Sequence, residues 1–141
     1  MAANRTIVLK GKLGRRYEEA RMSVAGKPGY LCEFDADGKL KPHATASIPI
    51  IPITVLVEDD LQGKTIDDTY AIDDLGRAVI AEPGDIIHFV LKTGQNVANG
   101  AYLKSNGDGT VVAGTNANSI AKAIEAVDAT AADKFIAAMV I

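Results

Sequence analysis

The sequence predicts a mainly β fold, a small β-barrel or β-sandwich body that follows an extended N-terminal arm and contains little helix. From Gly29 onward, short runs of β-branched and other apolar residues alternate with turn residues, which is typical of strands joined by tight turns. Hydrophobic residues make up 48% of the 141 residues, which is enough for one packed core. The residues before Gly29 are instead basic and interrupted by glycines.

The N-terminal segment, residues 1–28, differs in charge from the rest of the chain. It carries seven basic side chains against Glu18 and Glu19, a net charge of +5, which leaves −8 for residues 29–141 of a chain whose total is −3. A basic arm suits an acidic protein surface or a nucleic acid. We favour the protein surface, because Tyr17 is the only aromatic residue of the arm and an acidic body repels phosphates. A solvated, frayed terminus is the simpler alternative.

Two stretches of this arm have a local pattern. "TIVLKGKLG" (6–14) is consistent with a short strand, and "RRYEEARMSVA" (15–25) with one or two helical turns. Glycines and Pro28 interrupt both patterns, so we expect an extended segment that a partner orders. The predicted division is therefore a basic arm over residues 1–28 and a β-rich body over residues 29–141.

The body begins with a strand, a turn and a second strand. "YLCEF" (30–34) predicts a strand, and the Asp37-Gly38 dipeptide after it predicts a two-residue hairpin turn with positive φ at both positions. "ITVLVE" (53–58) is rich in β-branched residues and predicts a buried strand. The single Cys32 cannot form an internal disulfide, and its apolar neighbours predict a buried structural thiol.

An acidic segment follows, "DDLQGKTIDDTYAIDD" (59–74). It contains three adjacent pairs of aspartates: Asp59, Asp60, Asp67, Asp68, Asp73 and Asp74. Without His or Glu partners at a recognisable spacing, such pairs predict solvent-facing turns rather than a metal site. We expect neither a metal nor a cofactor.

Two more strands are predicted at residues 78–81 and 86–91, joined by a turn at Pro83-Gly84. His88 lies in the second of these strands and His43 in a loop. The sequence indicates no nucleophile or carboxylate beside either histidine, so neither is assigned a catalytic role. Because no triad, metal set or phosphate loop is recognisable, we expect no enzymatic activity.

The glycine-rich stretch "LKTGQNVANGAYLKSNGDG" (91–109) raises the question of a phosphate site. Five residues separate Gly94 from Gly100 and Ala-Tyr follows, which matches neither a P-loop nor a dinucleotide fingerprint. The Asn99-Gly100 and Asp108-Gly109 dipeptides instead predict hairpin turns. The C-terminal residues 119–141 fit an amphipathic helix and two strands equally well.

The order of these motifs resembles that of the small capsid decoration proteins of tailed bacteriophages, also called head cement or stabilisation proteins. In such proteins a G-D-x-V strand leads to G-x-x-V-x-x-G-x-x-L and then to S-x-G-D-G-x-V. The matching positions here are Gly84, Asp85, Gly94, Val97, Gly100, Leu103, Ser105, Gly107, Asp108 and Gly109. The family also ends in an A-x-E-A segment and an apolar run, which favours two strands in residues 119–141. The resemblance covers residues 29–141, and the long basic segment before them departs from the pattern.

The resemblance implies a β-tulip-like body and a structural role in a virion. Such proteins bind the outer surface of the expanded phage head and cement neighbouring capsomers against internal pressure. It also implies the major capsid protein and other copies of this chain as partners, with a homotrimer favoured over a dimer, and no direct contact with nucleic acid or membrane. Since the N-terminus lacks the pattern of a signal peptide, we expect synthesis in a cytoplasm. The resemblance implies that this is the bacterial host cytoplasm and that the final location is the outside of the capsid.

Under this resemblance the basic arm is the predicted capsid-binding element, reaching across capsid subunits. Its cations would meet acidic capsid patches, while its apolar stretch would add a strand to an exposed sheet edge. The predicted contact residues are Arg5, Ile7, Val8, Leu9, Lys10, Lys12, Arg15, Arg16 and Arg21.

One alternative function comes from another family resemblance. "VLKTGQNVANGAYL" (90–103) resembles the hairpins of biotinyl-type carrier domains, which would make the chain a barrel-sandwich binding or carrier module without catalysis. Such a carrier presents a lysine at a hairpin tip between Met-like residues. Lys92 and Lys104 lack such neighbours, so the virion role is preferred.

Overall fold

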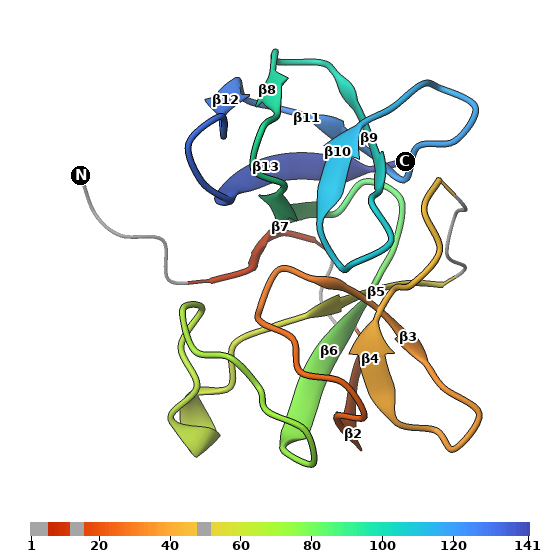
Figure 1. Ribbon diagram of the computed structural model, residues 1–141, viewed down its shortest axis with the longest axis vertical. Helices are drawn as coiled ribbons and strands as arrows, with labels where there is room; N and C mark the ends of the chain where they lie inside the picture. Colours follow the sequence, from red (N-terminus) through yellow and green to blue (C-terminus); the bar gives the residue numbers. More distant parts are fainter. Residues whose placement is uncertain (1–5, 12–15, 48–51) are drawn as a thin grey trace.

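The computed structural model describes residues 6–11, 16–47 and 52–141 (Figure 1). These residues form strands and turns almost throughout, and the single helical element among them is one short 3₁₀ turn, η1 (Asp60–Gln62). The predicted mainly β fold with a small barrel body is confirmed. No helix in the described ranges is long and apolar enough to cross a membrane.

One lobe of the molecule, the barrel lobe, is a closed five-stranded barrel (Figure 1, upper part). Its strands, in the order in which they pair, are β7 (Ile86–Leu91), β10 (Val111–Ala113), β9 (Tyr102–Ser105), β11 (Ala121–Ala123) and β13 (Lys134–Val140). The ladder between β13 and β7 closes the barrel. Alternate residues of β13, including Ile136 and Ala138, belong to the buried core, and their small or branched side chains suit a narrow interior.

A strand of the N-terminal segment, β1 (Val8–Lys10), is added to the sheet of this barrel by pairing with β7. β10 pairs in parallel with β7 only at Val111 and Leu91. β1 pairs with the other end of β7, at Ile86 and Ile87. The short strand predicted within residues 6–14 is confirmed, and it lies in the barrel of the same chain.

The second lobe, the sheet lobe, is a five-stranded antiparallel sheet (Figure 1, lower part). Its strands, in pairing order, are β2 (Arg16–Arg21), β6 (Leu75–Ala81), β5 (Ile53–Leu56), β3 (Leu31–Phe34) and β4 (Leu40–Pro42). The helical turns predicted within residues 15–25 are wrong, because Arg16–Arg21 is a strand paired residue by residue with β6. One or two isolated helical turns have too few hydrogen bonds to persist, whereas the ladder with β6 supplies a bond partner along the whole segment.

The sheet of the sheet lobe is covered on both faces. On one face, Leu31, Val55 and Val79 belong to the same buried cluster as Ile87 and Phe89 of the barrel, so the two lobes share a core. A separate cluster covers the opposite face: Met22, Cys32, Leu40, Leu56, Tyr70 and Ala78. Cys32 is a buried free thiol, as predicted, and burial raises its pKa far above the ordinary range.

The predicted turns form, though not all as two-residue hairpins. At the β3–β4 turn only Gly38 has positive φ, +78°, and the Asp35 carboxylate accepts the N–H groups of Asp37 and Lys39 at 2.9 Å each. Asn99-Gly100 does not join a hairpin. The strand before it, β8 (Asn96–Val97), pairs with β12 (Val127–Asp128) rather than with β9.

The C-terminal segment is composed of strands. β11, β12 and β13 occupy the stretch for which the residues alone left helix and strand open. The periodicity was compatible with either, and pairing of β13 with both β7 and β11 decides for strand.

Candidate functional site

The nine predicted capsid-binding residues do not form one cluster in the described structure. Arg5, Lys12 and Arg15 lie outside the described residues. Ile7 through Lys10 lie at β1 on the barrel lobe, whereas Arg16 and Arg21 are the two ends of β2 on the sheet lobe. Whether these residues contact a capsid stays a prediction.

β1 is held in place by its own chain. The side chain of Ile7 is fully buried in the shared core. Its N–H donates to Glu58 Oε2 at 3.0 Å, and its carbonyl accepts from the N–H of His88 at 2.8 Å. Thr6 adds a hydroxyl bond to Glu58 at 2.7 Å and a carbonyl 3.1 Å from His88 Nδ1. β1 thus pairs with β7 of its own chain, and addition of this segment to a neighbouring subunit stays a prediction.

The exposed residues of this region are mixed in charge. Leu9, which is 40% exposed, and Lys10 lie on the surface beside the barrel wall. Along β2, Arg16 is ion-paired with Glu18, and Arg21 donates to the Asp73 carbonyl at 2.9 Å. Charged side chains of this kind keep a sheet edge from pairing indiscriminately with other strands.

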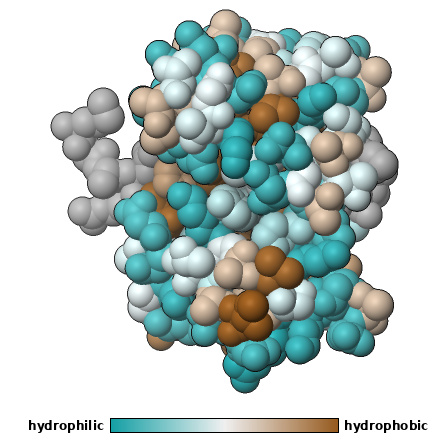
Figure 2. Space-filling model, in the orientation of Figure 1, coloured by the Kyte–Doolittle hydropathy of each residue, from teal (hydrophilic) through white to brown (hydrophobic). Residues whose placement is uncertain are grey.

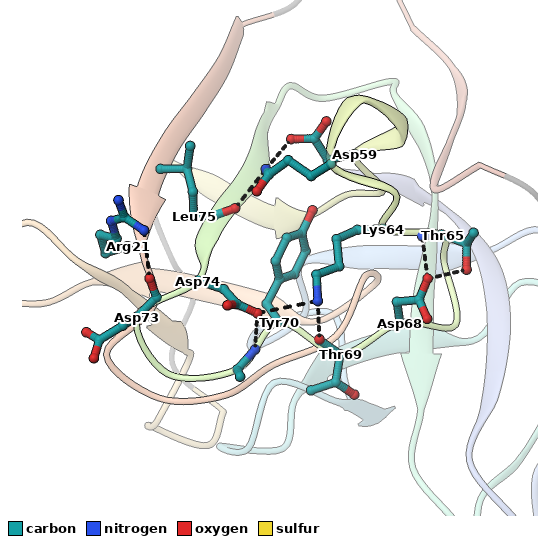
Figure 3. Close-up of polar contacts among 12 residues, drawn as sticks. Arg21, Asp59, Lys64, Thr65, Asp68, Thr69, Tyr70, Asp73, Asp74 and Leu75 are labelled. Atoms are coloured by element: carbon teal, nitrogen blue, oxygen red, sulfur yellow. Dashed lines mark hydrogen bonds and ion pairs between the residues drawn. The ribbon is translucent and has the colours of Figure 1, made fainter.

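A long acidic loop, residues 57–74, connects β5 to β6, and polar contacts among its residues are drawn in Figure 3. It contains seven carboxylates and one lysine, a net charge of −6. Tyr70 anchors it: the ring is fully buried and the hydroxyl donates to the Val57 carbonyl at 2.9 Å. Burial raises the pKa of Tyr70 well above its ordinary value, so the hydroxyl stays a donor at physiological pH.

Five of the six aspartates predicted on solvent-facing turns are exposed or half-buried, whereas Asp59 is buried; three of the six cap turns (Figure 3). Asp59 caps η1, Asp68 accepts from the Thr65 N–H and hydroxyl at 2.8 and 2.9 Å, and Asp74 accepts from the Ala71 N–H at 2.8 Å. The backbone bonds from Thr65 and Ala71 lower the pKa values of Asp68 and Asp74, since hydrogen bonds stabilise the charged form. Among the described residues, no three His, Cys, Asp or Glu side chains are placed to hold a metal ion.

One residue of this loop stands apart from the rest. Leu61, in the middle of η1, is 100% exposed although it is a large apolar residue. A hollow of about 330 Å³ lies beside it. The residues that line this hollow are Glu19, Glu58, Asp59, Asp60, Leu61 and Arg77. Leu61 is therefore an apolar knob in an acidic setting.

A second hollow, of about 430 Å³, lies where the two lobes meet near the C-terminus. Its described lining is apolar except for Glu82, and consists of Pro52, Ile53, Ile80, Ala81, Glu82, Pro83, Val140 and Ile141. We call it the apolar hollow. On the face drawn in Figure 2, by contrast, hydrophobic patches are small and scattered among hydrophilic residues.

A buried polar link, which the sequence analysis missed, joins the two lobes. His43 Nδ1 lies 2.7 Å from Ser105 Oγ on β9, and Nε2 lies 3.6 Å from Glu33 Oε2. Ser105 also accepts from the Gly107 N–H at 3.2 Å. Ser105 is 1% exposed and His43 is 5% exposed, so the arrangement encloses the hydroxyl instead of presenting it to a substrate. No sequence signal identifies this link, because its three residues come from separate segments.

The tip of the β9–β10 hairpin packs beside this link. The carbonyl of Gly109, at φ +89°, accepts from the Leu31 N–H at 2.8 Å. A Cβ on Gly109 would lie 2.6 Å from the Tyr30 ring. The glycine-rich stretch thus includes a docking point of one lobe on the other.

Asp108, next to Gly109 in this hairpin tip, has a lowered pKa. Partial burial alone would raise the pKa of Asp108, but bonds from Thr110 and Lys92 outweigh it and lower the value to about 2.

Comparisons with known proteins point to one fold. No family model matches the chain, and no curated protein matches it in sequence. Among solved structures, the chain is similar to the N base of the head fiber gp8.5 of bacteriophage phi29, with a TM-score of 0.59 and 14% sequence identity. The similarity covers 90% of this chain and 94% of that one. This chain therefore shares the overall fold of that head fiber base.

Proposed function

We propose that this chain is a bacteriophage structural protein that attaches to the outer surface of the phage head. The observation that carries the proposal is the shared fold. It spans nearly the whole of both chains, and the neighbour is by name the base of a head fiber. The motif order of residues 84–109, which resembles that of capsid decoration proteins, supports the same location from a separate source.

The finer proposal is that the protein cements neighbouring capsomers of the expanded head, with the major capsid protein as its partner. Such a role needs a rigid body and attachment surfaces rather than catalysis. The closed barrel and the shared core provide the rigid body. Exposed cations at the N-terminal segment, Lys10, Arg16 and Arg21, are the side chains that we assign to acidic patches on the capsid.

Attachment is tested by co-sedimentation of the full-length protein with purified heads before and after expansion. We expect saturable binding to expanded heads and little binding to unexpanded heads, because cementing requires the rearranged surface. Equal binding to both forms would contradict the cementing role, and absence of binding to either would contradict attachment to the head.

The role of the basic segment is tested with point substitutions rather than with a deletion. Removing residues 2–25 would also remove Ile7 and Met22, both fully buried, and so would disturb the fold. The double variant Lys10→Glu, Arg16→Glu reverses two exposed cations without touching the core. We expect it to bind expanded heads at least about tenfold more weakly and with less dependence on salt.

The matched control is Lys122→Glu, Lys134→Glu, which reverses two exposed cations on the barrel strands. We expect its binding to stay close to that of the wild type. If both double variants lose affinity equally, net charge governs attachment and the assignment to the N-terminal segment is wrong.

A further inference from the structure

The tip of the β9–β10 hairpin, residues 106–110, is held on the sheet lobe by contacts at its two ends. The Gly109 carbonyl accepts from the Leu31 N–H at 2.8 Å, and the Ser105 carbonyl accepts from the Ser47 N–H at 3.0 Å. Both bonds join the barrel lobe to the sheet lobe. A contact between two lobes that depends on a few polar groups can open while the lobes stay folded, because local opening costs less free energy than global unfolding.

The buried link beside this tip has one arrangement of protons that gives every donor an acceptor. Ser105 Oγ accepts the Gly107 N–H at 3.2 Å and donates its own proton to His43 Nδ1, 2.7 Å away. The ring proton is then on Nε2, which faces Glu33 Oε2 at 3.6 Å. A ring protonated on Nδ1 instead would leave the Ser105 hydroxyl without an acceptor among the described residues, and its Nε2 lone pair would face a carboxylate. The neutral ring with its proton on Nε2 therefore fits the link.

A second proton on the His43 ring conflicts with this arrangement. Protonation turns Nδ1 from an acceptor into a donor, so that Nδ1–H and the Ser105 O–H point at each other. The hydroxyl can turn and accept, but its proton then has no acceptor among the described residues and is shielded from water, because Ser105 is 1% exposed. A buried donor that loses its partner costs more than the net contribution of an ordinary hydrogen bond. The charged ring therefore destabilises the docked position of the hairpin tip.

The charged groups around the ring compensate only in part. Glu33 on β3 favours the charged ring, but its carboxylate is already paired with Lys41 on β4 at 3.3 Å, and Lys41 opposes the charge. The loop that leads from His43 to β5 contains no ionisable side chain. In the hairpin tip the one ionisable side chain, Asp108, is paired with Lys92 at 3.1 Å. Burial has the largest influence, so the pKa of His43 is lowered despite the nearby carboxylate.

We propose that acid releases the hairpin tip from the sheet lobe through protonation of His43. Above a pH of about 6.5 the ring is neutral whether the tip is docked or released, so the link is intact. As the pH falls below this value, the ring gains a proton more readily in the released form, because water solvates the charge and frees the Ser105 hydroxyl. The two lobes stay joined through the apolar residues of their shared core. This release is a property of the protein itself and stands without attachment to the head.

The test is amide hydrogen exchange of the full-length protein, measured by NMR at pH 7.5 and at pH 5, with each rate corrected for the intrinsic rate at that pH. The reporters are the N–H groups of Leu31 and Ser47, which donate across the junction. We expect their protection to fall by about fivefold or more between the two pH values, the factor that one unpaired buried donor implies. The Ile120 N–H, which donates to the Leu103 carbonyl within the barrel lobe, is the control and should keep its protection.

Two substitutions distinguish His43 from other titrating groups. His43→Gln keeps a polar side chain but cannot gain a proton, so the reporters should have equal protection at both pH values. Glu33→Gln removes the carboxylate that favours the charged ring, so the fall in protection should move to lower pH. The matched control is Glu125→Gln, at an exposed carboxylate of the barrel lobe, which should leave the pH profile unchanged.

Several outcomes would overturn the proposal. One is a His43 ring that titrates in the folded wild type at or above a pH of about 6.5, followed by NMR at its Cε1 proton. Another is a pH response of Leu31 and Ser47 that is absent from the wild type, or that persists in His43→Gln. An equal loss of protection at Ile120 would mean that acid unfolds the whole chain and does not release the tip. If His43→Gln fails to fold, an unshifted profile of Glu33→Gln has the same force.

Discussion

The two lobes of this protein bury their strands by different means. The barrel lobe closes on itself, so the alternating inward residues of its strands fill one interior. The sheet lobe is an open sheet that needs covering from outside. The barrel covers one face, and Met22 and Tyr70, which come from connecting segments, cover the other.

This difference predicts which substitutions should cost the most stability. A closed barrel has no free edge and depends on a repeating pattern of side chains. The sheet lobe depends on a few contacts made by loops, and loops tolerate change better than strands. The charged edge strand β2 and the acidic loop both belong to the sheet lobe, so we expect substitutions on its surface to cost less stability than substitutions in the barrel interior.

The largest effect should come from the barrel interior. Phe89 is fully buried in β7 at the shared core, so Phe89→Ala removes a large side chain and leaves a cavity. We expect a loss of about 3–5 kcal/mol in the free energy of unfolding, measured by urea titration. Met139→Ala, at an exposed position of β13, should cost less than about 1 kcal/mol. Similar losses for both variants would contradict the division between interior and exterior.

Substitution at the junction between the lobes should have the second-largest effect on stability. Gly109→Ala imposes a side chain at φ +89° and brings its Cβ against the Tyr30 ring. Gly84→Ala imposes a similar φ, +96°, with no atom within 4 Å of the new Cβ. We expect Gly84→Ala to lower the free energy of unfolding by about 1–2 kcal/mol from backbone strain alone, and Gly109→Ala to lower it clearly more. If thermal unfolding shows equal losses of stability for the two variants, the Tyr30 ring moves aside without cost.

Substitution in the acidic loop should lower stability less than substitution at the junction. Tyr70→Phe keeps the buried ring and removes the hydroxyl that donates to the Val57 carbonyl. We expect a loss of about 1 kcal/mol and faster amide exchange within residues 57–74. Tyr17→Phe, whose ring is 37% exposed and stacks under Arg77, is the control and should change neither quantity. Unchanged exchange in Tyr70→Phe would show that ring burial alone holds the loop.

The smallest effect should be the response of the buried link between the lobes to pH. Burial lowers the pKa of His43 below its ordinary value, and the nearby Glu33 carboxylate opposes this only in part. The neutral ring is therefore favoured in the folded state. Its contribution to stability is fully present above the unfolded pKa of about 6.5 and is lost as the pH falls through the lower folded pKa.

The measurement is the free energy of unfolding at pH 7.5 and at pH 5. The wild type should lose stability over this interval, and His43→Gln should lose less. The aspartates whose pKa values are lowered titrate below this window and do not interfere. A variant whose dependence on pH equals that of the wild type would exclude His43 as the source.

Local patterns allowed much of the body to be predicted. The strands at residues 31–34, 53–56 and 86–91 were expected from β-branched and apolar runs, and the turns at Gly38 and Gly84 from dipeptides. These features depend on neighbours in sequence. Residues 15–25 were expected to form one or two helical turns because their charges suit helical spacing, and only the ladder with β6 made Arg16–Arg21 a strand.

Other parts depended on residues that are far apart in sequence. The link of Glu33, His43 and Ser105 and the anchoring of Ile7 on Glu58 and His88 have no local signature. The exposed Leu61 was not singled out, because exposure is a property of packing rather than of composition.

The sequence by itself determined the class of fold, the positions of most strands and turns, and the division between a basic N-terminal segment and an acidic remainder. The tertiary structure alone decided that this segment supplies one strand to each lobe, and that an apolar hollow forms where the two lobes meet. The physical reason is the distance along the chain over which each effect acts. Backbone preference and side-chain alternation act over a few residues, whereas strand pairing and burial join segments that meet only when the chain has folded.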